Sequence, residues 1–201
     1  MAKIKQSPKM PAEKRKEQLL ASAKKLFVKK GYRGTTTEEI ARKAGLTKGA
    51  FYFYFKKKED ILLELIKSMA ECNRSALDEK ISAKTGLADL FDFVLDLHCK
   101  GDMHEYGDMV DIWVQAWRIP RIKKYIATRL REWMKNFSGL VPKKGFPRGT
   151  GPDDLALLII ATVDGLSTIR LMTPELVDLD KQQKLFRWLL SNSPVGQAAK
   201  N

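Results

Sequence analysis

The stretch TTTEEIARKAGLTKGAFYFYF, residues 35–55, decides the fold of this chain. Thr36 and Glu39 have the spacing of a capping box, in which each residue's side chain satisfies a backbone amide of the other at a helix start. A short helix over EEIARKA is therefore expected, and Gly45 suits the sharp turn that ends it. Thr47 is placed to cap a second short helix directly after that turn.

The aromatic run FYFYF at the end of this stretch is compatible with two structures. In a strand, the three phenylalanines would share one face and the two tyrosines the other. In a helix that begins at Lys48, Phe51 and Phe55 share a face toward the core, and Tyr52 and Tyr54 lie off it with free hydroxyls. The capped helix just upstream and the lack of a partner strand favour the helix, which leaves Phe53 on neither face.

The charge of the chain is concentrated near its start. Residues 1–67 contain 18 Lys and Arg against 7 Asp and Glu, whereas residues 68–201 contain 19 against 17. A basic N-terminal module joined to a nearly neutral body indicates a polyanionic partner for the module alone. The alternative is a lysine-rich helix that is merely solvated, which charge cannot exclude.

The rest of the chain also has helical periodicity, with no convincing strand and no internal repeat. The sequence predicts an all-α protein of about nine or ten helices. Further helices are expected over 11–30, 59 into the eighties, 87–100, 106–118, 120–140, 153–172 and 181–191. Residues 1–10 are expected to be a disordered leader and residues 193–201 a frayed tail.

The segment LFVKKGYRGTTTEEIARKAGLTKGAFYFYFKKKEDIL resembles the DNA-binding domain of the tetracycline-repressor (TetR) family, over roughly residues 12–66. The pairs Gly31-Tyr32, Lys48-Gly49 and Lys58-Glu59 are among the residues at the family's spacing. The resemblance implies an N-terminal three-helix helix-turn-helix domain over 11–58. It also implies a C-terminal helical domain for effector binding and dimerisation over 59–192.

In this family the second helix of the motif enters the major groove of double-stranded DNA. The resemblance therefore implies that small hydroxyls, a lysine at the helix start and outward aromatics contact DNA. Most of these contacts would position the protein on phosphates, and Phe53 could pack on a sugar or a thymine methyl. The expected DNA-binding residues are Thr36, Thr37, Thr47, Lys48, Gly49, Tyr52, Phe53, Tyr54 and Lys58.

A helix-turn-helix protein reads two half-sites about 34 Å apart when it is a dimer, so a dimer surface is expected. The helix at 153–172 is apolar almost all round and must be buried on more than one side. Together with the last helix it resembles the C-terminal pair that dimerises in many family members, although both could be intramolecular core. The expected interface residues are Leu155, Ile159, Leu166, Ile169, Phe186, Trp188 and Leu189.

The resemblance further implies a pocket for a small apolar or amphipathic effector, whose binding releases a repressor from a palindromic operator. The candidates are mainly methionine and aromatic side chains between the basic module and the last helices, although each could instead belong to the hydrophobic core. The expected pocket residues are Met69, Met109, Trp113, Trp117, Tyr125, Trp133, Ile160 and Asp164. The alternative is a DNA-binding regulator without an effector, controlled by a protein partner or serving an architectural role.

Other classes of protein have weaker support. His98, Asp102 and Glu105 could share a helical face, but they lack metal-ligand spacing and are expected to be solvated surface, so neither a metal, a cofactor nor an enzyme is predicted. Cys72 and Cys99 suit a reducing cytoplasm better than a disulfide. The start of the chain does not read as a signal peptide, and no apolar run is expected to span a bilayer, so a cytoplasmic protein without a membrane partner is expected.

Overall fold

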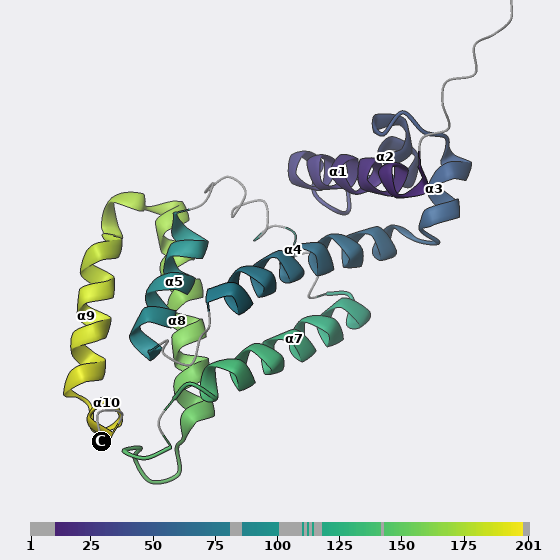
Figure 1. Ribbon diagram of the computed structural model, residues 1–201. Coiled ribbons are helices and arrows are strands. Elements are labelled where there is room, and N and C mark those ends of the chain that lie inside the picture. The colour runs from purple at the N-terminus through teal and green to yellow at the C-terminus, as the bar shows by residue number, and fades with distance from the viewer. Residues whose placement is uncertain are drawn as a thin grey trace, which may run out of the picture. The chain divides into compact units, whose positions relative to one another are not determined.

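The computed structural model describes residues 11–80, 86–100, 110, 112, 114, 118–141 and 143–198. Within these residues the chain is helical, with nine α-helices, one short 3-10 helix and no strand (Figure 1). The elements are α1 (Ala12–Lys30), α2 (Thr37–Lys43), α3 (Lys48–Tyr54), α4 (Lys58–Lys80), α5 (Leu87–Cys99), α7 (Pro120–Ser138), α8 (Pro152–Met172), η1 (Pro174–Leu176), α9 (Leu179–Asn192) and α10 (Pro194–Ala198). This confirms the all-α prediction, while most of the helix expected at 106–118 lies outside the described residues.

The chain divides into two compact units, and the division falls inside α4. One unit comprises residues 1–71 with residues 111–119, and the other comprises residues 72–110 and 120–201. The sequence predicted a boundary inside or beside this helix, with domains over 11–58 and 59–192. The first half of α4 belongs with the first unit, and its apolar side chains, such as Ile61, Leu62 and Ile66, are almost fully buried.

The core of the first unit is formed by one apolar stripe from each of α1, α2, α3 and α4. Its most deeply buried members are Leu19, Ala23, Phe27, Ile40, Ala41, Phe51, Phe55, Ile61, Leu62 and Ile66. An ion pair between Lys16 Nζ on α1 and Glu64 Oε1 on α4, at 2.6 Å, joins the first and last of these helices. The short helices α2 and α3 are therefore held by packing, since helices of seven residues are unstable alone.

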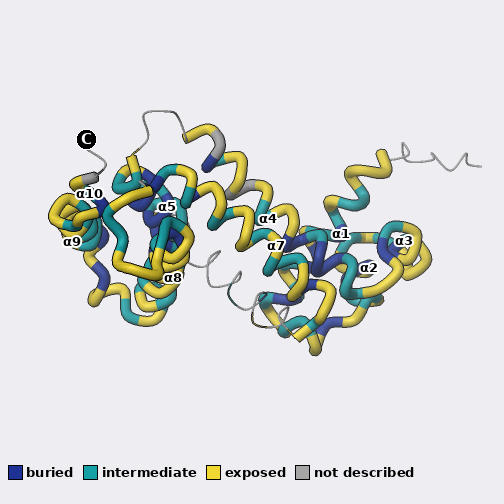
Figure 2. Tube along the Cα trace, turned by 90° about the horizontal axis from the view of Figure 1, so that it is seen from below, coloured by how far each residue is buried: buried dark blue, intermediate teal, exposed yellow. Residues whose placement is uncertain are grey.

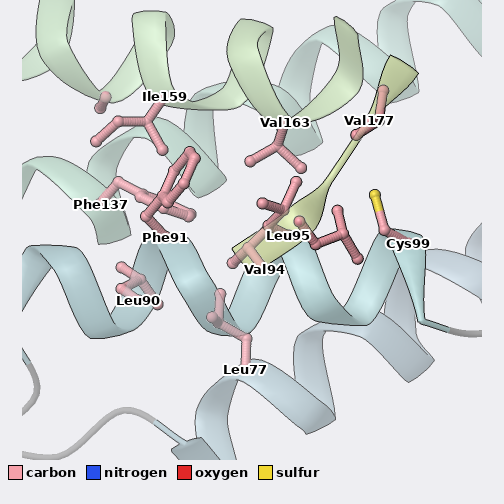
Figure 3. Close-up of a cluster of buried hydrophobic side chains, with 12 residues drawn as sticks. Leu77, Leu90, Phe91, Val94, Leu95, Cys99, Phe137, Ile159, Val163 and Val177 are labelled. Atoms are coloured by element: carbon pink, nitrogen blue, oxygen red, sulfur yellow. The ribbon is translucent and has the colours of Figure 1, made fainter. Parts of the chain in front are cut away.

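The core of the second unit lies where α5 packs against α8 and α9, and α7 packs against α8 and contributes Phe137. Figure 3 shows side chains from α4, α5, α7 and α8 converging there, including Leu77, Phe91 and Ile159. The rings of Phe91 and Phe186 stack with centroids 3.7 Å apart, and Arg187 on α9 pairs with Asp89 and Asp92 on α5. These contacts fix α9 against α5.

Helix α8 corrects one expectation from the sequence. It has 21 residues, and an 18-residue window of it has a mean hydropathy of 1.8, so by length and composition it could cross a membrane. One such helix is weak evidence for a membrane span, because the core helix of a soluble protein has the same composition. Only 22% of its apolar window is buried within the chain, so much of its apolar surface remains to be covered.

The end of the chain is more ordered than the sequence predicts. Residues 194–198 form α10, where a frayed tail was expected. Val195 is 8% exposed, and the backbone amide of Gly196 donates to Ser193 Oγ at 3.0 Å. Burial of a single apolar side chain and a local hydrogen bond explain why the last described turn is helical.

Candidate DNA-binding surface

The capping box that opens α2 is present. Thr36 Oγ1 accepts from the backbone amide of Glu39 at 3.2 Å, and the backbone amide of Thr36 donates to Glu39 Oε2 at 3.0 Å. The hydrogen bond from the Lys30 ammonium lowers the pKa of Glu39 to about 2, so this carboxylate is ionised at neutral pH. Gly45 ends the motif's first helix with φ of 68°, in the left-handed region that its lack of a Cβ permits.

The aromatic run is helical, which decides between the two structures that its pattern allowed. Thr47 Oγ1 accepts from the backbone amide of Ala50 at 3.2 Å and caps α3. Phe51 is fully buried and Phe55 is 4% exposed, whereas Tyr52 is 45% and Phe53 is 80% exposed. A strand would have buried Phe53 together with the other two phenylalanines.

Four side chains of α2 and α3 form a polar chain on the exposed surface of the motif. The Lys48 ammonium pairs with Glu38 Oε1, and Thr37 Oγ1 donates to Glu38 Oε2 at 3.0 Å. The hydroxyl of Tyr52 lies 3.3 Å from Thr37 Oγ1. The contact with Glu38 raises the pKa of Lys48, and the contact with Lys48 lowers the pKa of Glu38, so both groups are charged at neutral pH.

The other predicted DNA-binding residues occupy the same motif in different surroundings. Thr36, Thr47 and Gly49 are exposed at the starts of α2 and α3, and Tyr54 is half-buried. The exposed side chains of Arg42, Lys43, Lys56 and Lys57 add positive charge to this unit. Glu38 was not among the residues singled out from sequence. Its only signal was its position four residues before Arg42 in the capped helix.

Lys58 makes contacts within the protein. Its ammonium donates to the backbone carbonyls of Tyr32 and Thr35, each at 2.7 Å, and lies 4.3 Å from the centroid of the Tyr32 ring. Burial lowers the pKa of Lys58 and is the main cause of raising the pKa of Tyr32 to about 12. Lys58 thus ties the start of α4 to the turn between α1 and α2, so a phosphate would have to compete with these carbonyls.

Replacing Lys58 with alanine is expected to destabilise the first unit by about 1–3 kcal/mol, because two carbonyls lose a charged donor. Chemical denaturation followed by circular dichroism measures this loss. Lys57→Ala, one residue away and exposed, is the matched control and should change the free energy of unfolding by about 0.5 kcal/mol or less. Equal losses in the two variants would contradict a structural role for Lys58.

The predicted pocket residues are divided between the two units. Met109, Trp113 and Trp117 lie outside the described residues. Met69 is half-buried on the part of α4 that belongs to the first unit. In the second unit, Tyr125, Trp133 and Ile160 are half-buried and Asp164 is exposed.

The predicted dimer residues separate into two groups. Ile159 is 1% exposed in the core of the second unit, and Leu155, Leu166 and Phe186 pack against that core. Ile169, Trp188 and Leu189 are exposed. The sequence could not separate these groups, because α8 is apolar on nearly every side.

Many positions along both α8 and α9 are exposed (Figure 2), and several of them carry large apolar side chains. We call them the outer apolar residues; they are Leu157, Leu158, Ile169, Met172, Leu185, Trp188 and Leu189. On α8, Leu158, Ile169 and Met172 share one stripe of the helix. Thr162 and Gly165 lie on the same stripe, and such small residues permit close approach of a second helix.

No group of three or more metal-ligating side chains lies together among the described residues. His98 Nδ1 donates to the Val94 carbonyl at 2.8 Å, within its own helix. Asp102 and Glu105, its proposed partners, are outside the described part of the chain. Cys99 is buried, with its Sγ 3.3 Å from Ser167 Oγ, and Cys72 has no described side chain.

The geometry of the first unit agrees with comparisons to known proteins. Residues 19–65 match the family model described as bacterial regulatory proteins, tetR family. The chain belongs to the TetR family. It is accordingly a helix-turn-helix transcriptional regulator, and that family is not enzymatic.

Two curated relatives of this TetR-family chain come from Bacillus subtilis. The HTH-type transcriptional regulator YerO is 49% identical over 49 residues, which are 24% of this chain and 17% of YerO. The HTH-type transcriptional regulator YfiR is 26% identical over 151 residues, which are 71% of this chain and 72% of YfiR. The stronger identity is thus confined to a segment that spans under a fifth of YerO.

Two solved structures share the fold over most of the chain. NalD of Pseudomonas aeruginosa, described as the secondary repressor of the MexAB-OprM multidrug efflux pump, matches with a TM-score of 0.68 and 22% identity, over 87% of this chain and 93% of NalD. FadR of Bacillus subtilis, solved with stearoyl-CoA, matches with a TM-score of 0.67 and 22% identity, over 84% and 93%. At these identities the likeness establishes the fold alone.

Proposed function

We propose that this TetR-family regulator is a repressor that binds a palindromic operator as a homodimer and is released by a small effector. The observation that carries the DNA-binding part is the surface of α2 and α3. It places Lys48, Tyr52 and Phe53 outward on a helix that is anchored by a fully buried Phe51. A major groove admits one α-helix, and α3 is the helix with this exposed polar and aromatic surface.

The outer apolar residues support the dimer. Exposed patches of large apolar side chains on a soluble chain mark interaction surfaces. A symmetric pairing of α8 and α9 with the same helices of a second copy would cover them and would present two recognition helices to two half-sites. Such a protein acts where its DNA is, so we also place it in the cytoplasm.

The effector is the finer part of the proposal. The half-buried Tyr125, Trp133 and Ile160 supply aromatic and apolar surface in the second unit. FadR, which has the same fold, was solved in complex with stearoyl-CoA, an amphipathic molecule. Release requires that the effector bind the DNA-free arrangement more tightly than the DNA-bound one.

Selection of duplexes from a random pool with the purified protein tests DNA binding directly. We expect an enriched palindrome, with affinity that falls by about 10³-fold or more between 50 and 200 mM salt if six or more phosphates are contacted. Lys48→Ala and Tyr52→Phe should each weaken binding to the enriched duplex while leaving the thermal midpoint unchanged. Lys144→Ala, in the second unit, is the control and should bind like the parent.

Absence of any enriched sequence would overturn the proposal. Enrichment of a palindrome with unchanged affinity in both variants would instead overturn the assignment of these two contacts. Screening amphipathic compounds for release of the enriched duplex then separates an effector-controlled repressor from a regulator that has no effector.

A further inference from the structure

The polar chain on α2 and α3 has a fixed direction of hydrogen bonding. A carboxylate only accepts hydrogen bonds, so the single hydroxyl proton of Thr37 points to Glu38 Oε2, at 3.0 Å. Thr37 Oγ1 must then accept from Tyr52, whose hydroxyl lies 3.3 Å away. The Lys48 ammonium donates to the other oxygen of the same carboxylate, Glu38 Oε1. Three donors thus lead to one acceptor group, Glu38.

These three donors are the ones that the proposed function assigns to DNA. In the structure, Lys48 and Thr37 donate directly to Glu38, and the Tyr52 hydroxyl donates to Thr37 Oγ1. Phosphate oxygens and the acceptor edges of bases require the same protons. Glu38 therefore occupies the position that an anionic acceptor of DNA, such as a phosphate oxygen, would take at the proposed DNA-facing surface.

Fold stability does not account for this arrangement. The side chains of Lys48 and Glu38 are 58% and 49% exposed, and exposed ion pairs contribute little to stability. Glu38 lies in the first turn of α2, where a carboxylate also favours the helix, but that effect requires no partner on α3. We therefore look for the effect of the Glu38–Lys48 ion pair in the binding of a molecule to this surface.

We propose that Glu38 is a specificity-determining residue that competes with DNA for the donors of Lys48, Thr37 and Tyr52. The inference rests on the DNA-binding function proposed above. Every duplex must displace Glu38 from these donors or approach its charge, and the size of this penalty depends on the donor that the duplex offers to Glu38 in exchange. An operator that presents a cytosine N4 amino group to the displaced Glu38 offsets the penalty, whereas an unrelated duplex offers only phosphates, which repel the carboxylate. Glu38 thus suppresses non-specific binding more than operator binding.

Glu38→Gln tests the proposal, because glutamine keeps the size of the side chain and removes its charge. The probes are the duplex enriched from the random pool and a shuffled duplex of the same length and composition, each titrated between 50 and 200 mM salt. We expect the shuffled duplex to bind about fivefold to tenfold more tightly at 0.1 M salt, with a salt slope steeper by about 0.9. The ratio of affinities for the two duplexes should fall at least threefold.

Glu17→Gln is the matched control, because it makes the same charge change on α1 of the same unit, at an exposed side chain. It should leave the affinity ratio unchanged. If Glu38→Gln behaves like Glu17→Gln while the parent still enriches a palindrome, the inference about Glu38 is overturned and DNA binding stands. If the parent enriches nothing, the proposed function itself fails.

Circular dichroism at each salt concentration guards against unfolding as the cause. Should Glu38→Gln fail to fold, Glu38→Ala removes the same charge at an exposed position in the first turn of α2. That variant should shift the same affinity ratio in the same direction, and an unchanged or increased ratio would contradict the competition.

Discussion

Replacing Phe51 with alanine is expected to destabilise the first unit by about 3–5 kcal/mol, the range for removing a fully buried phenylalanine. Phe51 has no exposed surface, and its ring packs with centroids 5.8 Å from Phe55 and 5.5 Å from Tyr52. The cavity would lie directly beneath the recognition helix. Denaturant unfolding monitored by circular dichroism measures the loss, and DNA binding should decline with the folded fraction.

The neighbouring phenylalanine provides the control. Phe53 is 80% exposed on the same helix, so Phe53→Ala should change the free energy of unfolding by about 0.5 kcal/mol or less. In a strand, the two side chains would share a face and the two variants would be similar. Equal losses from Phe51→Ala and Phe53→Ala would therefore contradict the helical placement of the whole aromatic run.

Introducing a charge among the outer apolar residues is expected to convert the proposed dimer to a monomer. Leu158 is 62% exposed in the single chain, and Leu158→Glu would place an unpaired carboxylate in the paired surface. Burial of such a charge costs several kcal/mol, so the dimer dissociation constant should rise at least a hundredfold. Sedimentation should then report a species near 22.9 kDa in place of one of twice that mass.

The same substitution on another helix controls for added charge. Leu130, on α7, is 39% exposed, and Leu130→Glu should leave the dimer intact. The Leu158→Glu monomer should lose most of its affinity for a two-half-site duplex, because the two domains no longer bind as one molecule. A Leu158→Glu protein that remained dimeric would show that these residues are not the dimer surface.

Local chemistry explains why the helix-turn-helix could be predicted. Thr36, Glu39, Gly45 and Thr47 act on backbone groups within four residues of themselves, so their spacing carries the information. The separation of Phe51 from Phe53 follows from the helical period once these caps are present. The excess positive charge of residues 1–67 can likewise be counted from the sequence without knowledge of the fold.

Long-range contacts explain what the sequence could not provide. Lys58 was expected at a phosphate, and it lies on carbonyls 23 and 26 residues earlier in the chain. Glu38 meets Lys48 only because the turn folds α3 back across α2. On α8, Ile159 and Leu158 are adjacent and equally apolar, yet one is 1% exposed and the other 62%.

The sequence by itself determined that this chain is helical, where the second helix of its helix-turn-helix begins, and which family it belongs to. Those properties depend on caps, turns and periodicity, which act over a few residues. Only the tertiary structure decided which faces of α8 and α9 stay outside the core and which acceptor holds the donors of the DNA-facing surface. Both properties depend on which distant helix covers each side chain. An apolar or charged residue has the same chemistry whether it is covered or exposed, so the sequence alone does not reveal which it is.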